Sequence, residues 1–348
     1  MKKETLYNKK NRLDLENELK NETFSRVTCS FYRYVFIENP ELLRDELYRE
    51  WSTLQIFGRI YIASEGINAQ LSCPENNWNL FVDTIRSRDI LNNIPIKKAI
   101  QDGASFYKLT IKVKEEIVKY NVDKGDYDMN HVGKHLSAKE FNSKLEEDNT
   151  LVVDMRNYYE SEVGRFENAI IPDVDTSRDL LPEVKSLLNG HEEDEILLYC
   201  TGGIRCEKAS AYLIKNGFSN VNQLQGGIIQ YAHDIKSQGL DSKFLGKNFV
   251  FDARMGERVT NDIIGECHQC GRPADKHLDC GNEACHILFI QCDKCYKEYD
   301  GCCTKECKDF ASLPIEEQRI LRKDPEKVVS QTRYSSRVKP KLSRINQS

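Results

Sequence analysis

One cysteine lies in a setting that would make its thiol reactive. Cys200 directly follows the apolar run Ile196 to Tyr199, and the loop after it consists of Thr201, Gly202, Gly203, Ile204 and Arg205. Two adjacent glycines let successive backbone N–H groups turn inward as a nest for an anion, and the N-terminus of a following helix adds partial positive charge. We therefore expect a lowered pKa for Cys200 and a nucleophilic thiol at neutral pH. The same nest would stabilise a terminal persulfide.

The spacing between Cys200 and Arg205 separates two kinds of reactive loop. Tyrosine-phosphatase-like loops place an arginine six positions after the cysteine, whereas here Arg205 is at the fifth position and Cys206 at the sixth. The shorter loop suits sulfur better than a phosphate monoester. A cysteine that only packed as a small hydrophobe would not need this loop after it.

Three further residues near this loop have two roles each on sequence alone. Cys206 is a possible second thiol: it would resolve an oxidised or persulfidated Cys200 through a disulfide, or it is a buried residue of the first helical turn. Asp154 and Arg156 follow the apolar run Leu151 to Val153. They line the same mouth, or they form an ion pair that orients loops.

A second group of cysteines has the spacing of metal ligands. Nine of the 13 cysteines fall between Cys267 and Cys307, and two CxxC pairs stand among them. Tetrahedral zinc sites take four thiolates or imidazoles, so one or two structural zinc ions are expected, with reduced thiols as the alternative. Among several pairings that the spacing allows, one puts Cys267, Cys270, Cys292 and Cys295 in one site and Cys280, Cys285, Cys303 and Cys307 in the other, which leaves Cys302 spare.

The reactive loop needs an α/β domain to hold it, which we expect over residues 130–240. The runs Leu151 to Val153 and Ile196 to Tyr199 are apolar without alternation, which is typical of strands buried on both faces of a parallel sheet. A helical pattern follows the loop and ends at Asn216-Gly217. Because open α/β sheets bind ligands at the carboxyl ends of their strands, Cys200 lies at the expected place.

A different α+β pattern precedes it over residues 24–122. Strands are expected at 28–37, 59–63, 67–71 and 109–113, with helices beginning at Asn39-Pro40 and containing Trp78 to Ile85. The order is βαββαβ, the ferredoxin-like arrangement. At 348 residues the chain is too long for one core, and we expect a polar arm at 1–23, a linker at 123–129, a cysteine-rich segment at 241–312 and a basic tail at 313–348.

The net charge, the basic runs and the N-terminal sequence limit which partners and which compartment the protein can have. With a formal net charge of -5, any nucleic acid must be held by a local basic surface. One such run interleaves Phe106 and Tyr107 with Lys97, Lys98, Lys108, Lys112, Lys114 and Lys119; it would hold RNA phosphates, or it is a solvated strand and loop. The tail adds the basic residues Arg333, Arg337, Lys339, Lys341 and Arg344. No signal peptide or membrane-length apolar run is seen, so we expect a cytoplasmic protein without a membrane partner.

The chain resembles the rhodanese-domain tRNA uridine hydroxylases over roughly residues 25 to 310. The matching segments are Gly58 to Asn68, Val153 to Glu160, Tyr199 to Ser210, Gly226 to Ile228 and Phe249 to Asp252. The resemblance implies a rhodanese domain, tRNA as partner, and oxygen-dependent formation of 5-hydroxyuridine at the wobble position, with Cys200 as the active residue. Met155 and Ser64 depart from residues that the family tends to have, valine and histidine.

Residue chemistry alone leaves the route to the product open. We find no dinucleotide (NAD) fingerprint, flavin motif or facial-triad iron pattern. A persulfide or sulfenic acid on Cys200 would carry oxygen, or the thiolate would attack C6 of the pyrimidine. Two rival functions are a sulfurtransferase acting through a Cys200 persulfide and a non-enzymatic persulfide-sensing or redox-sensing protein. The intact loop argues against the sensor, and the two flanking domains argue against a minimal sulfurtransferase.

Overall fold

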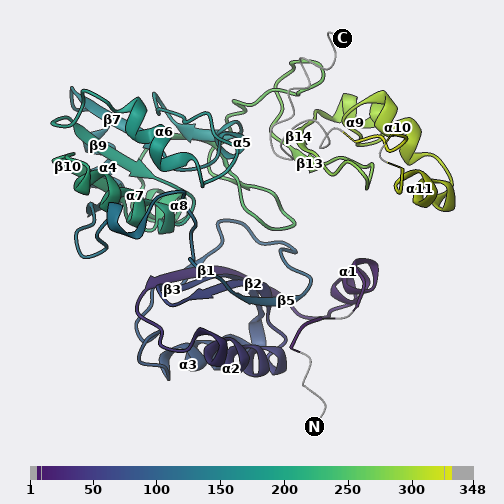
Figure 1. The fold of residues 1–348 in the computed structure, drawn as a ribbon, viewed down its shortest axis with the longest axis horizontal. Helices are drawn as coiled ribbons and strands as arrows, with labels where there is room; N and C mark the ends of the chain where they lie inside the picture. The colour runs from purple at the N-terminus through teal and green to yellow at the C-terminus, as the bar shows by residue number, and fades with distance from the viewer. Residues whose placement is uncertain (1–5, 9, 325, 331–348) are drawn as a thin grey trace.

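The structure is a computed structural model that describes residues 6–8, 10–324 and 326–330, arranged as three packed parts and an N-terminal helix (Figure 1). The helix is α1 (Arg12–Lys20), which begins after Asn11, whose side chain accepts a hydrogen bond from the backbone N–H of Asp14. Among the described residues, no helix is long and apolar enough to cross a membrane. The tail residues Arg333, Arg337, Lys339, Lys341 and Arg344 lie outside the described part of the chain.

The first part confirms the expected βαββαβ order. Its elements are β1 (Arg26–Tyr34), α2 (Pro40–Thr53), β2 (Phe57–Ala63), β3 (Gly66–Pro74), the short 3-10 helix η1 (Glu75–Asn77), α3 (Trp78–Arg86), β4 (Lys97–Lys98) and β5 (Leu109–Val113). The sheet order is β4-β1-β3-β2-β5. Sequence reasoning missed β4, because two residues give no periodicity. This short strand pairs antiparallel with β1, while β5 pairs parallel with β2 at the other edge.

Helices cover only one face of this sheet (Figure 1). On that face Phe31 of β1 contacts Trp51 of α2 and Phe81 of α3 with ring centroids 6.4 Å apart in both pairs. Asn39 accepts a hydrogen bond from the N–H of Leu42 and so starts α2 with its apolar side toward the sheet. Because side chains of a strand alternate, the other face of β1 presents polar residues toward the second part of the chain.

The second part is the expected parallel α/β domain. It contains β6 (Lys134–Leu136), α4 (Ala138–Lys144), β7 (Thr150–Asp154), α5 (Tyr158–Ser161), β8 (Gly164–Phe166), α6 (Leu180–Leu187), β9 (Glu195–Tyr199), α7 (Ile204–Lys215), β10 (Asn220–Leu224) and α8 (Gly227–Gln238). The sheet order is β6-β10-β9-β7, and each pair is parallel. A 3-10 turn, η2 (Lys124–Asp126), precedes it within the predicted linker.

The central strand β9 explains the absence of alternation in its sequence. Ile196 and Leu198 pack into one core with Leu213 of α7, whereas Leu197 and Tyr199 pack into another with Tyr231 of α8. These four residues of β9 are all buried. Helices on both faces of the sheet therefore require apolar side chains at successive positions.

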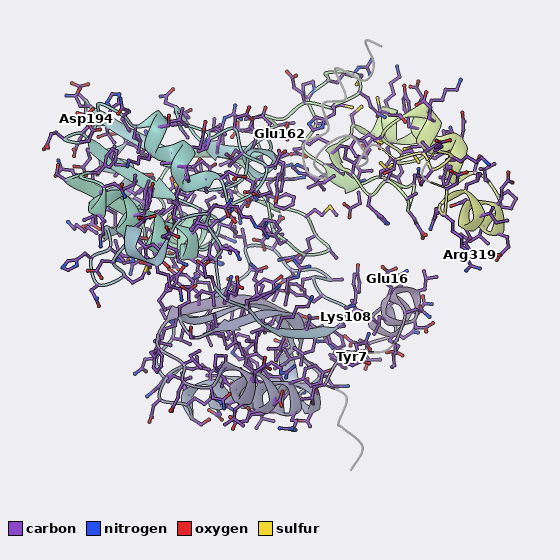
Figure 2. All side chains as sticks on the ribbon, in the orientation of Figure 1. Tyr7, Glu16, Lys108, Glu162, Asp194 and Arg319 are labelled. Carbon is purple, nitrogen blue, oxygen red and sulfur yellow. The ribbon has the colours of Figure 1, made fainter. Side chains whose placement is uncertain are left out.

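The third part begins as an extension of the second. Its elements are β11 (Phe244–Asn248), β12 (Glu257–Arg258), β13 (His277–Asp279), β14 (Leu288–Ile290), α9 (Asp293–Tyr299), α10 (Lys305–Ala311) and α11 (Ile315–Leu321). Strand β11 pairs antiparallel with β8 of the preceding domain. Nearby, His268 Nε2 lies 3.0 Å from Oε1 of Glu162, which Figure 2 marks at this junction.

Charged groups join the first and second parts. Lys208 of α7 is fully buried, and its Nζ lies 3.1 Å from Glu65 and 2.8 Å from Glu116 of the first part. Its ammonium also donates to the carbonyl oxygen of Val118. At the preceding residue of α7, Glu207, the carboxylate accepts a hydrogen bond from the Tyr32 hydroxyl over 2.9 Å. Helix α7, which carries the reactive loop at its N-terminus, is thereby fixed against the first sheet.

We predict that Lys208→Met lowers the free energy of unfolding by about 2–3 kcal/mol. This is less than the ~3–5 kcal/mol of a fully buried pair, because Glu65 and Glu116 keep part of their surface in water. Urea unfolding measures the change. Lys215→Met, at the exposed end of the same helix, should change the midpoint little. Equal midpoints for the two variants would contradict the role of Lys208 in joining the domains.

Candidate active site and cysteine clusters

The reactive loop lies at the carboxyl end of β9, as its sequence predicts. Cys200 is fully buried, and the N–H of Gly203 donates to its Sγ over 3.1 Å. Gly203 has a φ of 98°, which favours glycine, and a Cβ there would lie 2.8 Å from the Tyr32 hydroxyl oxygen. Helix α7 begins at the next residue, Ile204, so its N-terminal N–H groups face the sulfur.

These surroundings favour the thiolate form of Cys200. Burial raises its pKa, but the neighbouring Cys206 thiol, the charge of Arg205, and the backbone N–H groups of Arg205 and Gly203 outweigh burial and bring the pKa to about 6. The thiolate therefore predominates at neutral pH.

Cys206 serves this thiolate in a way that sequence reasoning did not consider. It is a fully buried residue of the first turn of α7, and burial together with the charge of Cys200 raises its pKa well above the ordinary value. Cys206 therefore stays protonated and donates a hydrogen bond to the Cys200 sulfur.

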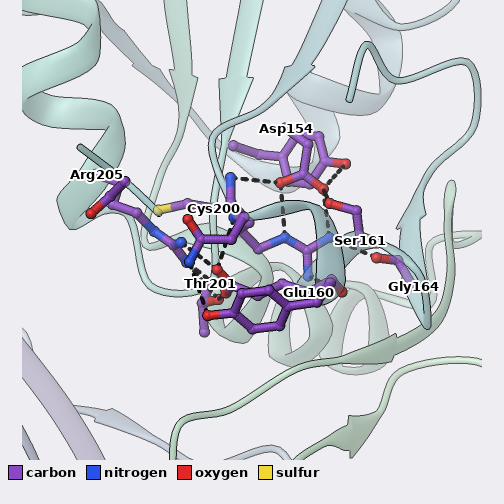
Figure 3. Close-up of polar contacts among 12 residues, drawn as sticks. Asp154, Glu160, Ser161, Gly164, Cys200, Thr201 and Arg205 are labelled. Atoms are coloured by element: carbon purple, nitrogen blue, oxygen red, sulfur yellow. Dashed lines mark hydrogen bonds and ion pairs between the residues drawn. The ribbon is translucent and has the colours of Figure 1, made fainter. Parts of the chain in front are cut away.

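Arg205 is held by a carboxylate that sequence reasoning missed. Its Nη1 and Nη2 lie 2.6 Å and 2.9 Å from the two carboxylate oxygens of Glu160, and Nη2 also donates to Thr201 Oγ1 (Figure 3). Glu160 is fully buried and accepts from the N–H of Asn157 as part of a capping box at the start of α5. The N-x-x-E pattern was the available signal. Both terminal nitrogens of the Arg205 guanidinium are thus hydrogen-bonded to protein groups, and these bonds fix the loop.

Asp154 and Arg156 form the ion pair that was one of their two expected roles. Arg156 Nη2 lies 2.6 Å from Asp154 Oδ2, and both side chains are fully buried. Asp154 also accepts from Tyr199 and Ser161, and Arg156 donates to the carbonyl oxygen of Gly164 (Figure 3). Neither residue lines the cavity that opens in front of Cys200. The pair joins β7, α5 and β8 behind the loop.

A cavity of about 930 Å³ opens in front of Cys200. Its walls come from all three parts of the chain: the first sheet contributes Tyr32 and Lys97, the loop contributes Cys200, and the third part contributes Phe251. This volume is in the range of small-molecule and nucleotide sites.

The wall opposite Cys200 is the uncovered face of the first sheet. Residues of three adjacent strands lie side by side there, because Arg59 pairs with Gln70 and Gln70 with Ser30. The next row along the strands consists of Tyr61, Asn68 and Tyr32. Such a face offers hydrogen-bonding groups and aromatic rings on which a base can stack.

The predicted run of lysines does not form one surface. Lys97 lines the cavity, whereas the next residue, Lys98, lies over the ring of Trp78 at 5.1 Å. Lys114 and Lys119 line the cavity rim, and Lys119 is paired with Glu115. Lys108 and Lys112 are exposed and do not line the cavity. The two readings of this run therefore apply to different members: Lys97, Lys114 and Lys119 lie at the cavity, whereas Lys108 and Lys112 are solvated, because neighbouring strand residues point to opposite faces.

The cysteine-rich part gathers eight sulfurs into two clusters (Figure 2). The clusters contain the same cysteines that the spacing grouped: Cys267, Cys270, Cys292 and Cys295, and Cys280, Cys285, Cys303 and Cys307. Within each cluster all sulfurs lie within 4.8 Å of one another. Cys302 belongs to neither cluster.

The sulfur separations in these clusters suit a metal ion. Cys270 and Cys292 are 3.7 Å apart and Cys285 and Cys303 are 3.8 Å apart, far beyond the ~2.05 Å of a disulfide. Four thiolates placed tetrahedrally at ~2.3 Å from a zinc ion would be roughly 3.8 Å apart. Both clusters can therefore bind a metal.

Comparison with known proteins assigns the family. The chain is 50% identical to the tRNA uridine(34) hydroxylase of Leptospira interrogans over 99% of its own length and 94% of the relative's. The chain belongs to the tRNA uridine(34) hydroxylase family. The hydroxylase of Pectobacterium atrosepticum is 47% identical, with 91% of this chain and 90% of that protein covered.

Family models match the three parts of this hydroxylase-family chain separately. Residues 26–117 match the UPF0176 acylphosphatase like domain, 137–234 the rhodanese-like domain and 245–308 the rhodanase C-terminal region. The chain is also similar to a rhodanese-like domain protein from Staphylococcus aureus, at 25% identity and a TM-score of 0.24, over 28% of this chain and 90% of that one.

We predict that iodoacetamide alkylates Cys200 with a pH midpoint near its pKa of about 6. The rate should be at its plateau above pH 7 and fall about tenfold per unit well below the midpoint, because only the thiolate reacts. Trypsin cleaves after Lys185 and Arg205, so mass spectrometry separates residues 186–205, which contain Cys200, from Cys206. A midpoint near the ordinary value of 9.0 would contradict the thiolate assignment.

Proposed function

We propose that this protein hydroxylates C5 of the wobble uridine of tRNA, in an oxygen-dependent reaction that yields 5-hydroxyuridine, and that the Cys200 thiolate is its reactive group. The observation that carries the proposal is a thiolate of pKa about 6 at the wall of a cavity large enough for a nucleotide. The printed activity of the relatives, tRNA uridine(34) hydroxylase, supplies the substrate and reaction.

A tRNA substrate fits the arrangement of this cavity. A uridine cannot reach a buried thiolate while it is stacked in an RNA loop, so the base enters as a splayed-out nucleotide. The exposed cations Arg178 and Lys114 at the cavity wall are available for its phosphates, while the polar face of the first sheet contacts the base. None of the 13 cysteines is joined in a disulfide, which suits the reducing cytoplasm, where we place the protein.

Among the routes from Cys200 to the product, addition of the thiolate to C6 uses only groups already at the site. A sulfur electron pair forms the S–C6 bond, and the C5=C6 pair moves toward C5 and the carbonyl oxygen O4. C5 becomes electron-rich and can form a bond to O2, which with a proton gives a hydroperoxide at C5. Two electrons from a thiol reductant in solution then cleave the O–O bond to leave a hydroxyl on C5 and release water, and loss of the C5 proton restores the C5=C6 bond and expels the sulfur. The N–H groups of the loop stabilise the sulfur charge before addition and after sulfur leaves.

We predict that Cys200→Ser abolishes formation of 5-hydroxyuridine, because a hydroxyl does not ionise in this nest at neutral pH. Mass spectrometry of nucleosides from tRNA incubated with enzyme and O2 measures the product. Circular dichroism should show an unchanged fold.

Cys206→Ser is the comparison variant: serine keeps a hydrogen-bond donor beside Cys200, so the loss of product formation should be milder than in Cys200→Ser. Product formation by Cys200→Ser would remove Cys200 from the mechanism. Transfer of sulfur from thiosulfate by the wild-type protein, without hydroxylation, would favour the sulfurtransferase instead.

We propose that each cysteine cluster holds one structural zinc ion. Four thiolate ligands per cluster leave no open coordination position, which is typical of zinc sites that stabilise a fold. The segment has little core of its own, because cysteines make up most of the cluster of buried residues around Ile287 and Phe289. Zinc would supply folding free energy there and take no part in the oxidation.

We predict that Cys303→Ser lowers the zinc content from two ions per chain to one, since it removes a ligand of one cluster. Cys302→Ser is the matched control: it is the adjacent buried cysteine, outside both clusters, and should keep both ions. Elemental analysis of protein purified without chelator measures the content. Equal zinc in both variants, or no zinc in the wild type, would contradict the assignment.

A further inference from the structure

Lys97 is a buried cation in the wall of the cavity in front of Cys200. It lies on β4, where it pairs with Ser30 of β1, and its side chain lines the cavity together with Cys200. The residue is 8% exposed, and its Nζ lies 4.6 Å from the centre of the Tyr32 ring. The strand that sequence reasoning missed thus delivers a positive charge to the wall opposite the reactive sulfur.

Two other cations around the cavity, one buried and one partly buried, already have carboxylate partners. Arg205 pairs with Glu160, and Arg254 pairs with Asp252 and Glu257. Lys97, in contrast, forms no ion pair with any residue that the structure describes; its contact is the ring of Tyr32. An unpaired buried charge is costly, so a side chain held this way implies an anion that arrives or forms in the cavity.

The stem of Lys97 and the reactive loop pack against the same glycine turn. A Cβ on Gly226 would lie 3.4 Å from Lys97 Cδ, and a Cβ on Gly227 would lie 2.5 Å from the carbonyl oxygen of Cys200. Both glycines have positive φ, 70° and 67°. The turn lets β4 and the loop approach closely, and substitution at either position would push them apart.

We propose that Lys97 is a catalytic residue whose ammonium pairs with the Cys200 thiolate in the free enzyme and with O4 of the uracil after sulfur adds to C6. The inference rests on the proposed function of Cys200. When the S–C6 bond forms, the negative charge leaves sulfur and the C5=C6 electron pair places it on O4. A fixed ammonium in the same cavity stabilises the charge at both positions, and it does so without reorganising water.

The protonation of Lys97 is consistent with this role. Burial lowers its pKa to about 8, while the charges of Cys200 and Glu207 act in the opposite direction. The groups that face it are Tyr32 of β1, Cys200 of the loop and Glu207 of α7; from α8, His233 contacts the carbonyl oxygen of Lys98. The ammonium is present below pH 8 and lost above it. Cys200 is ionised above about pH 6, so the thiolate and the ammonium are both present, and the enzyme is active, between about pH 6 and pH 8.

The test compares Lys97→Met, Lys97→Gln and Lys97→Arg by alkylation of Cys200 as a function of pH. Lys98→Met is the matched control, because it removes the same charge one residue away on the opposite face of the sheet. Without the Lys97 charge, the midpoint of Cys200 alkylation should rise by about one unit, which is roughly tenfold slower alkylation at pH 5. Lys97→Arg should keep most of the wild-type profile, and Lys98→Met all of it.

Single-turnover hydroxylation of tRNA provides the second readout. Lys97→Met should lower the rate constant about 100-fold, as loss of one oxyanion-stabilising group does, without weakening tRNA binding. An alkylation midpoint equal to that of wild type in Lys97→Met and Lys97→Gln would overturn the proposal. Hydroxylation by Cys200→Ser would instead overturn the proposed function, whatever the alkylation profile of the Lys97 variants.

Discussion

The buried ion pair between Arg205 and Glu160 is the interaction on which the site depends. A loop that holds a thiolate away from water needs positive charge beside the sulfur, and a buried guanidinium needs a carboxylate in turn. Glu160 satisfies both Nη atoms of Arg205, and its place at the start of α5 is fixed by its own hydrogen bond to the N–H of Asn157. Arg205 therefore stabilises charge at Cys200 while its direction is fixed by the protein. The substrate need not organise it.

All three parts of the chain are needed to enclose the cavity, because the thiol loop supplies only one of its walls. A base bound at Cys200 alone would remain in water, where charges that move during reaction are screened. The first sheet closes the opposite wall, and its position is fixed by contacts between Tyr32 and Glu207 and between Lys208 and Glu65. Both contacts lie on α7, the helix that also begins at the reactive loop. Closure of the cavity and geometry of the loop thus depend on the same helix.

Local patterns in the sequence were sufficient for the loop, for the main order of elements and for recognising the cysteines as metal ligands, whereas the grouping into two clusters, one of several that the spacing allows, comes from the structure. The residues Thr201 to Arg205 act on a cysteine only one to five positions before them. Each CxxC pair likewise brings two ligands together within one turn of the chain. The features that were missed depend on long-range packing. Glu160 meets Arg205 across 45 positions, and β4 exists only because Lys97 can pair with Ser30 of a distant strand. Lysine spacing alone likewise gave no reason to separate Lys97 from Lys98.

The cysteine-rich part contributes to the site through packing. Cys267 and Cys295 share a buried cluster with Tyr159 and Phe249, whose rings meet edge to face at 5.4 Å. Tyr159 directly precedes Glu160 in α5, so the residue that fixes Arg205 is backed by side chains of the first cysteine cluster. The chain between β11 and β12 leads from Phe249 to the cavity wall at Phe251. A metal ion bound by the first cysteine cluster would therefore act on Cys200 only indirectly, by holding α5 and this segment in place. Its loss should loosen the loop without changing any group that reacts.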